Sequence, residues 1–370
     1  MTRTLLLILC LGLVSACDSG GGDVLQTPDD EQTGNGSNGD GDGDQDGAGG
    51  GPIDSDKELP PGTETPNPSE TIFRREPFDA ERGDGYLREV RYNADDDTFF
   101  VEGLGFDGSQ PDGAAFSRSA FGQLGSRYAL YEAPRIFNDS VTGTPINQLA
   151  HRALYGVSPS GQTEFAIVRT GGYMNYGFGG FIYQRNGDVV LPAEGQGTYK
   201  GDYGAVRDFD GRGGLEYTDG IAEIDIDFSG FRGNCVSAEC DNAVKGTISG
   251  RRLFDVNGND ITRVYLDALS AQNGGVALSQ MPVVSFEVGP NVADRNGEIS
   301  GTVFTALNSN DGTSITSNLA EGGSYYAVMS GDHTSLPGGE IVGVVVFEND
   351  DPRYEGVTVR ETGGFVAVRR

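Results

Sequence analysis

Residues 222–228 read AEIDIDF, and apolar and acidic side chains alternate strictly along this stretch. Alternation with a period of two places the two kinds of side chain on opposite faces of a β-strand. A row of carboxylates is tolerated only in contact with water, so one face of this strand is buried and the other is solvated. Parallel strands are covered on both faces, and the pattern therefore predicts an antiparallel sheet.

Strand signals of this kind continue along the second half of the chain. We expect eight strands after Gly195, centred on Tyr199, on Ile224 and on residues 244–253, 283–288, 299–305, 325–329, 341–347 and 357–368. Asn-Gly pairs at 186–187, 257–258, 273–274 and 296–297, together with Asp311-Gly312, separate the runs and are typical of tight hairpins. Eight antiparallel strands over residues 195–370 fit an up-and-down β-barrel, which has no open edge, and a two-sheet sandwich is the competing arrangement.

Residues 85–190 predict a smaller, handle-like β module in front of the barrel. Its strand candidates are residues 86–92, 99–106, 127–132, 150–157, 164–169 and 180–184. A short helix over residues 113–124 is a further expectation, although glycine limits its length. The predicted fold class is therefore all-β, with an eight-stranded antiparallel up-and-down β-barrel preceded by the smaller module.

Charge and motif content exclude several classes of function. The 370 residues carry 26 Lys and Arg against 55 Asp and Glu, a net charge of −29, so a nucleic-acid partner is not expected. Two His cannot build a three-His zinc site, and G-x-S-x-G, H-E-x-x-H and P-loop motifs are absent from the sequence. The chain has so many Asp and Glu residues that their spacing alone does not exclude a catalytic pair of carboxylates for glycoside hydrolysis. We expect no catalytic residues, no metal and no cofactor, and a protein that is not an enzyme.

The N-terminal residues predict export and a lipid anchor. Residues 5–14 form a ten-residue apolar run, which is too short to span a bilayer and is typical of a signal peptide, here residues 1–16. Val14-Ser15-Ala16-Cys17 resembles a bacterial lipobox, in which Cys17 becomes the lipidated N-terminus. The alternative is an ordinary signal peptide with an incidental Cys. The predicted location is the outer membrane, on its surface or periplasmic face. Asp18, directly after Cys17, keeps the inner membrane as an alternative location.

The segment after Cys17 predicts a flexible acidic tether up to residue 70. Residues 18–70 contain 13 Gly and 14 Asp and Glu against a single Lys, with almost no apolar side chains. Such a segment buries too little apolar surface to offset the entropy that ordering costs. The membrane is therefore a predicted partner only through the lipid anchor.

Two further groups of residues are candidates for local roles. Cys235 and Cys240 lie five positions apart in a polar loop, which in an exported protein predicts a disulfide. Residues 171–181 interleave glycine with aromatic residues, so Tyr173, Tyr176 and Phe178 are candidate ligand contacts. The alternative for these rings is packing within a glycine-kinked strand.

The order of these parts resembles one lobe of the transferrin-binding protein B family of bacterial surface lipoproteins. The similar motifs are GTYKG at 197–201, GTI at 246–248, ISGTV at 299–303, and GGSYY at 322–326 followed by IVGVV at 341–345. The chain departs from the family at 327–330, where AVMS replaces the usual GPKA, and it has one lobe instead of two.

This resemblance implies non-enzymatic binding of a protein or an iron source that is passed to an outer-membrane transporter. It does not identify the ligand, because the contacts lie in loops that do not align. A lipocalin-like carrier of a small molecule and a structural or adhesive surface lipoprotein are the alternatives.

Overall fold

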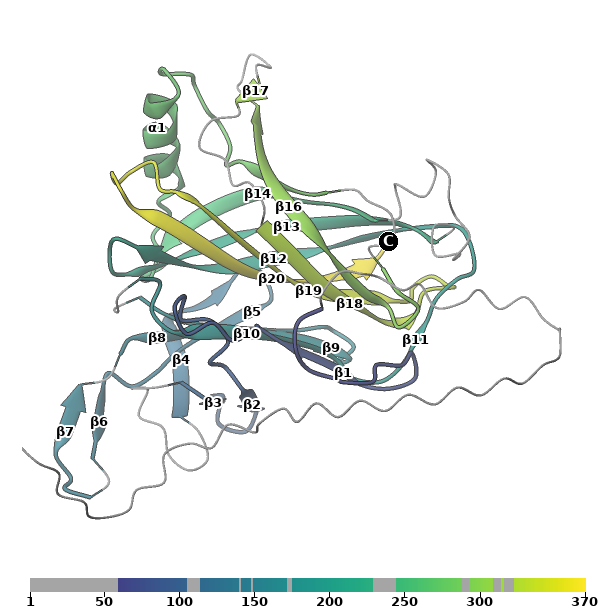
Figure 1. Cartoon of the computed structure of the whole chain (residues 1–370), viewed down its shortest axis with the longest axis horizontal. Coiled ribbons are helices and arrows are strands. Elements are labelled where there is room, and N and C mark those ends of the chain that lie inside the picture. Colours follow the sequence, from purple (N-terminus) through teal and green to yellow (C-terminus); the bar gives the residue numbers. More distant parts are fainter. Residues whose placement is uncertain are drawn as a thin grey trace, which may run out of the picture. The chain divides into compact units, whose positions relative to one another are not determined.

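A closed barrel and a second antiparallel sheet hold most of the strands of this all-β protein (Figure 1). The computed structural model describes residues 59–104, 114–139, 141–147, 149–171, 175–228, 244–287, 293–308, 314–315 and 323–370. All of these residues belong to one compact unit.

The barrel is a ring of eight antiparallel strands. Around the ring they are β12 (Gln196–Asp210), β13 (Leu215–Asp227), β14 (Val244–Asp255), β15 (Val283–Phe286), β16 (Glu298–Asn308), β18 (Gly323–Asp332), β19 (Glu340–Asp350) and β20 (Thr358–Arg369). Pairing of β16 with β18 and of β20 with β12 closes the ring. Short strands β11 (Val189–Val190) and β17 (Ser314–Ile315) add to β18 and β16. The predicted barrel is confirmed, and the sandwich alternative is wrong.

The alternation that predicted the barrel is present in β13. Ala222, Ile224 and Ile226 are buried inside the ring, whereas Glu223 and Asp225 face solvent. The exposed carboxylates bind side chains of neighbouring β12, with 3.0 Å between Glu223 Oε2 and Lys200 Nζ. The apolar face thus fixes the register of the strand, because a slip by one residue would bury the carboxylates.

Side chains fill the interior of the barrel. Its core contains the inward-facing residues Tyr199, Tyr203, Ala205, Ala222, Ile224, Ile226, Phe228, Val244, Ile248, Val284, Phe286, Ile299, Val303, Tyr325, Ala327, Met329, Ile341, Val345, Phe347, Phe365 and Ala367. Among the described residues, the hollow beside Arg207, Arg251 and Tyr265 has a volume of only about 10 Å³. This volume is at the lower limit for a single water molecule, and eight strands leave an interior that side chains can fill.

The second sheet, which we call the handle sheet, has eight strands. In sheet order they are β1 (Ile72–Arg75), β10 (Gly179–Arg185), β9 (Thr163–Thr170), β8 (His151–Val157), β5 (Tyr128–Glu132), β4 (Ala114–Leu124), β3 (Thr98–Glu102) and β2 (Glu89–Asn93). Strands β6 (Ile136–Asn138) and β7 (Pro145–Asn147) form a separate hairpin. The helix expected over residues 113–124 is wrong, because burial alternates along the start of β4 and that strand pairs with β3 and β5.

One helix was not expected. Helix α1 (Thr262–Gln272) packs Tyr265, Leu266 and Leu269 against Leu253 of the barrel. The Asn-Gly pair at 273–274 ends this helix instead of closing a hairpin, since the backbone N–H of Asn273 donates to the Leu269 carbonyl and Gly274 has a φ of +72°. The same dipeptide serves both purposes because it adopts positive φ readily.

The handle sheet packs on the outside of the barrel through a shared apolar core. This core joins Tyr128, Leu154, Phe165 and Ile167 of the handle sheet with Val206, Tyr217, Val342, Val344 and Val366 of the barrel. Tyr128 crosses the junction, because its hydroxyl accepts a hydrogen bond of 2.8 Å from the backbone N–H of Val366.

The ordered fold begins before residue 71, within the predicted tether. The backbone of residues 61–63 pairs with β1, as in the 3.0 Å hydrogen bond from the Thr63 N–H to the Phe73 carbonyl. Arg185 donates to the carbonyls of Asn67 and Glu70 at 3.0 and 2.8 Å. Backbone pairing with β1 and hydrogen bonds from the Arg185 side chain to backbone carbonyls therefore order this segment, which has almost no apolar side chains of its own.

His333 is buried at the end of the barrel where β12 begins. Its Nδ1 lies 2.5 Å from the Tyr199 hydroxyl, and its ring packs against Phe228. Desolvation lowers the pKa of His333 from 6.5 to about 4, so the buried imidazole is neutral at pH 7. The sequence places this residue in a polar loop and gives no sign of its burial.

We expect stability to fall as the pH falls from 6.5 toward 4, because the unfolded chain takes up a proton on His333 before the folded chain does. The wild type loses about 2 kcal/mol through this group between pH 7 and 4.5. Urea unfolding of His333→Gln should lack this part of the loss, whereas Tyr199→Phe, which keeps the imidazole, should retain it. Equal pH dependence in wild type and His333→Gln would contradict the assignment.

Candidate functional site

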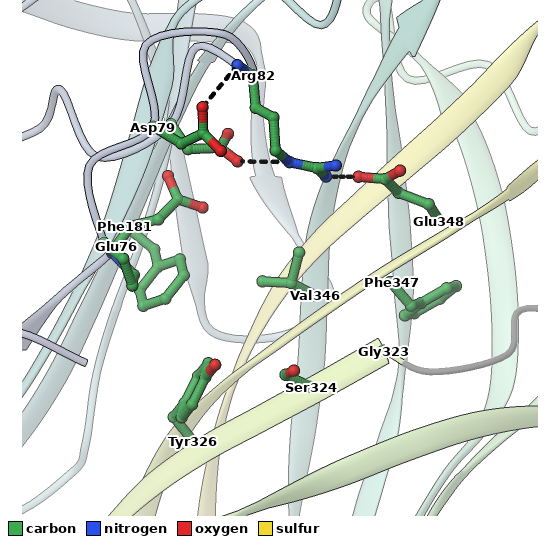
Figure 2. Close-up of a pocket in the computed structure, with 12 residues that line it drawn as sticks. Glu76, Asp79, Arg82, Phe181, Gly323, Ser324, Tyr326, Val346, Phe347 and Glu348 are labelled. Carbon is green, nitrogen blue, oxygen red and sulfur yellow. Dashed lines mark hydrogen bonds and ion pairs between the residues drawn. The ribbon is translucent and has the colours of Figure 1, made fainter. Parts of the chain in front are cut away.

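A groove of about 410 Å³ lies where the handle sheet meets the barrel (Figure 2). One wall is the loop of residues 76–85, which follows β1, and the other is formed by β18 and β19. The lining residues are Glu76, Pro77, Asp79, Arg82, Asp84, Phe181, Gly323, Ser324, Tyr326, Val346, Phe347 and Glu348. The floor is largely apolar, with the rings of Phe181 and Tyr326 stacked at 6.2 Å.

A tight turn gives the loop its shape. The backbones of Asp79 and Asp84 exchange two hydrogen bonds of 3.0 and 3.1 Å, and the Asp79 carboxylate accepts from the N–H groups of Glu81 and Arg82. Gly83 has a φ of +75°, and a Cβ at this position would lie 1.6 Å from the carbonyl oxygen of Gly177. Only glycine permits this approach, so the glycine-rich run at 171–181 supports the wall of the groove.

Arg82 reaches across the groove from the loop to the barrel. Its guanidinium pairs with Glu348 of β19 and, at 3.3 Å, with Asp84, as Figure 2 shows for Glu348. The Arg82 side chain is 46% exposed and that of Glu348 is 33% exposed. An ion pair this open to water contributes at most about 1 kcal/mol, so another cation can displace Arg82 at low cost.

Beneath the groove lies a buried network of charges, which we call the junction network: Glu76, Asp84, Arg169, Asp208 and Arg360. Arg169 of β9 binds Glu76 at 2.5 Å and Asp84 at 3.2 Å. Arg360 of β20 binds Asp208 of β12 at 2.6 Å and also pairs with Asp84. Asp84 therefore joins an arginine of the handle sheet to one of the barrel. Burial raises the pKa of Glu76, with Arg169 opposing the shift.

The groove combines an acidic rim with an apolar floor. Glu76 and Asp84 already have arginine partners below the groove, whereas Asp79 and Glu348 lie at its rim beside Arg82. A Lys or Arg side chain has an apolar stem and a charged end, which match the floor and the rim. The arrangement is therefore suited to binding a cationic side chain. Within the described residues, no cluster of three or more His, Cys, Asp or Glu is placed to hold a metal ion.

The candidate ligand aromatics Tyr176 and Phe178 lie close to the loop and make packing contacts, and their role in ligand binding stays a prediction. Tyr176 is 7% exposed, lies 4.5 Å below the Arg360 guanidinium and shares a 2.7 Å hydrogen bond with Thr358. Phe178 packs edge-on against Tyr86. Cys17, Cys235, Cys240 and Tyr173 lie outside the described residues, so the lipid anchor, the disulfide and the third aromatic contact stay predictions.

Sequence reasoning missed the residues that form the groove. Arg82 and Glu348 are 266 positions apart, and nothing in either local sequence indicates the other. The run FRREPFDAERGDG at 73–85 carries a dense mixture of charges directly before the predicted module. That density is the one signal that marks the segment, although it does not say which charges are buried.

No family model matches the chain, and no curated protein matches it. Among solved structures it is similar to a double mutant of transferrin-binding protein B from Haemophilus parasuis Hp5, at 13% identity and a TM-score of 0.32, over 77% of this chain and 45% of that one. Intact Ap-TbpB, with its N and C lobes, gives 14% identity and a TM-score of 0.32 over 77% and 47%.

The chain thus spans about half the length of these structures. No helix in the described part of the chain is long and apolar enough to cross a bilayer.

We expect Arg360→Ala to destabilise the protein by about 3–5 kcal/mol, because it leaves the buried carboxylate of Asp208 with uncompensated charge. Arg263→Ala is the matched control, since Arg263 forms an exposed pair with Asp267 and should cost less than about 0.5 kcal/mol. Urea unfolding at pH 7 measures both. A loss in Arg360→Ala no larger than in the control would show that the junction network does not hold the two sheets together.

Proposed function

We propose that this chain is a non-enzymatic binding protein of the cell envelope, anchored through lipid at Cys17, which captures a protein ligand with its outer surface. We further propose that the ligand is an iron source or carries one, and that this chain passes it to an outer-membrane transporter. Support for the anchor comes from the apolar run at 5–14 and the lipobox-like residues 14–17. Support for the transporter comes from the resemblance in strand motifs.

The filled barrel is the observation that carries this proposal. A small-molecule carrier needs an enclosed cavity of some hundreds of Å³, whereas the hollow beside Arg207, Arg251 and Tyr265 has about 10 Å³. Large aromatic side chains such as Tyr199, Tyr203 and Tyr325 occupy the space that a ligand would take. Recognition is thus assigned to the outside of the barrel, which weighs against the lipocalin-like alternative.

The groove at the junction is the proposed contact surface. Its 410 Å³ are too small for a folded partner but large enough for one or two projecting side chains. A partner with an exposed Lys or Arg would replace Arg82 at Glu348 while its stem covers Phe347 and Tyr326. The net charge of −29 would also steer a basic partner toward this surface.

The lipid anchor is tested by metabolic labelling with radioactive palmitate in a bacterial host. We expect label in the wild-type chain and in its membrane fraction, and loss of both in Cys17→Ser, because the Cys17 thiol is the proposed acylation site. Unlabelled wild-type protein, or label that persists in Cys17→Ser, would overturn the anchor while leaving the binding surface open.

Ligand capture is tested by presenting the full chain to host and environmental proteins and, separately, to haem. We expect a basic protein to bind, with about tenfold weaker affinity for Glu348→Gln because the variant loses one charge-assisted contact. Glu223→Gln is the matched control, since Glu223 makes an exposed ion pair on the barrel wall. Binding should also weaken as salt increases.

Two outcomes would redirect the proposal. Equal affinity of Glu348→Gln and Glu223→Gln for the captured protein would remove the groove from the contact surface. Saturable binding of haem at one site, with no protein captured, would favour the small-molecule carrier in spite of the filled barrel.

A further inference from the structure

A second hollow at the junction has a different chemistry from the groove. Its volume is about 330 Å³, and it lies between the end of β9 and the turn that joins β12 to β13. The lining residues are Arg135, Ala150, Arg152, Gly171, Arg212, Gly214, Leu215, Glu216, Asp255 and Val256. Three arginines in one hollow are notable in a chain with 26 Lys and Arg against 55 Asp and Glu.

Aromatic rings hold Arg212 in place, and among the residues that the structure describes no acid pairs with it. Its guanidinium lies over the ring of Phe209 at 4.4 Å and over that of Tyr354 at 4.2 Å. Contact with rings occupies the faces of the guanidinium and leaves its in-plane N–H groups for hydrogen bonds. Within the described part of the chain, Nε bonds only the Gly213 carbonyl, and the buried Nη1 has no acceptor.

Two glycines bring the Arg212 turn close to the handle sheet. A Cβ on Gly171 would lie 2.4 Å from the carbonyl group of Gly214, and the Gly214 N–H donates to the Gly171 carbonyl. This approach places Arg212 in the same hollow as Arg152 and Arg135. Arg152 is buried and pairs with Glu132, whereas no carboxylate among the described residues pairs with Arg135.

The two acids that line the hollow already have partners elsewhere. Glu216 accepts from Arg207 at 3.0 Å and from Arg353 at 2.8 Å. The Asp255 carboxylate accepts from the backbone N–H groups of Asn257 and Asn259 and from the Asn259 side chain, all at 2.8–2.9 Å. Neither acid is therefore a partner of Arg212, which keeps an unpaired Nη1 donor in the wall of the hollow.

We propose that this hollow binds a small organic anion, a carboxylate or a phosphate monoester that carries a compact apolar group. The in-plane N–H groups of Arg212 bind the oxyanion, with Arg135 adding charge at the rim. Leu215, Val256 and Ala150 pack against the apolar group. Planar bidentate recognition of carboxylate and phosphate is the chemistry for which arginine is best suited. The inference does not rest on the proposed function, because the groove shares none of these residues.

The test is calorimetric titration of the full chain with phenyl phosphate, benzoate and inorganic phosphate. We expect saturable binding of phenyl phosphate or benzoate with Kd of about 1 mM or below, and inorganic phosphate weaker than phenyl phosphate because it lacks the apolar group. If phenyl phosphate binds more tightly than benzoate, the natural headgroup is a phosphate, and if benzoate binds more tightly, it is a carboxylate.

Variants assign the binding to Arg212. We expect Arg212→Ala to weaken the tighter ligand about tenfold or more, since a charge-assisted hydrogen-bond pair is lost. Arg212→Lys keeps the charge and the stem but not the fork, so it should weaken binding several-fold and serves if the alanine variant does not fold. Arg263→Ala, on the exposed face of α1, should bind as the wild type does.

Three results would overturn the proposal. These are no saturable binding of phenyl phosphate or benzoate below about 10 mM, equal Kd values for Arg212→Ala and Arg263→Ala, and inorganic phosphate binding as tightly as phenyl phosphate. The last result would mean that charge alone accounts for the affinity and that the apolar wall is not part of the site.

Discussion

The sharing of Asp84 between Arg169 and Arg360 is the interaction on which the arrangement of the two sheets depends. Asp84 belongs to the loop after β1, Arg169 to the handle sheet and Arg360 to the barrel. Their charges are buried, so each one is tolerable only while its partner stays in place. A fully satisfied buried polar network makes a core more rigid and specifies one arrangement, and here it adds to the packing of the shared apolar core.

The junction of the two sheets forms both hollows. They differ in the sign of the charged side chains that face them. In the groove, arginines below the surface neutralise Glu76 and Asp84, and the rim keeps the acids Asp79 and Glu348. In the second hollow the acids are neutralised from behind, and Arg212 keeps unused donors. A strongly acidic chain thus presents one surface suited to cations and another suited to anions.

The sequence predicted what depends on local periodicity. Alternation along residues 222–228 and in the later strands was enough for the eight-stranded barrel, because most inward side chains are apolar. The same rule fails at Arg360, whose polar side chain would be assigned to solvent although it is buried between the sheets. Helix α1 was missed because the Asn-Gly pairs that flank it at 257–258 and 273–274 suggest hairpins. The groove was missed because its walls come from residues more than 200 positions apart.

The pairing of β20 with β12 has a consequence for how the chain acquires its structure. Tyr199 and its partner Arg369 are separated by 170 positions, so the ring closes only after all the intervening strands have been synthesised. Until β20 pairs with β12 and β19, the tyrosines and valines of the interior stay exposed to water. The unpaired edges of β12 and β19 are then free to pair with other chains.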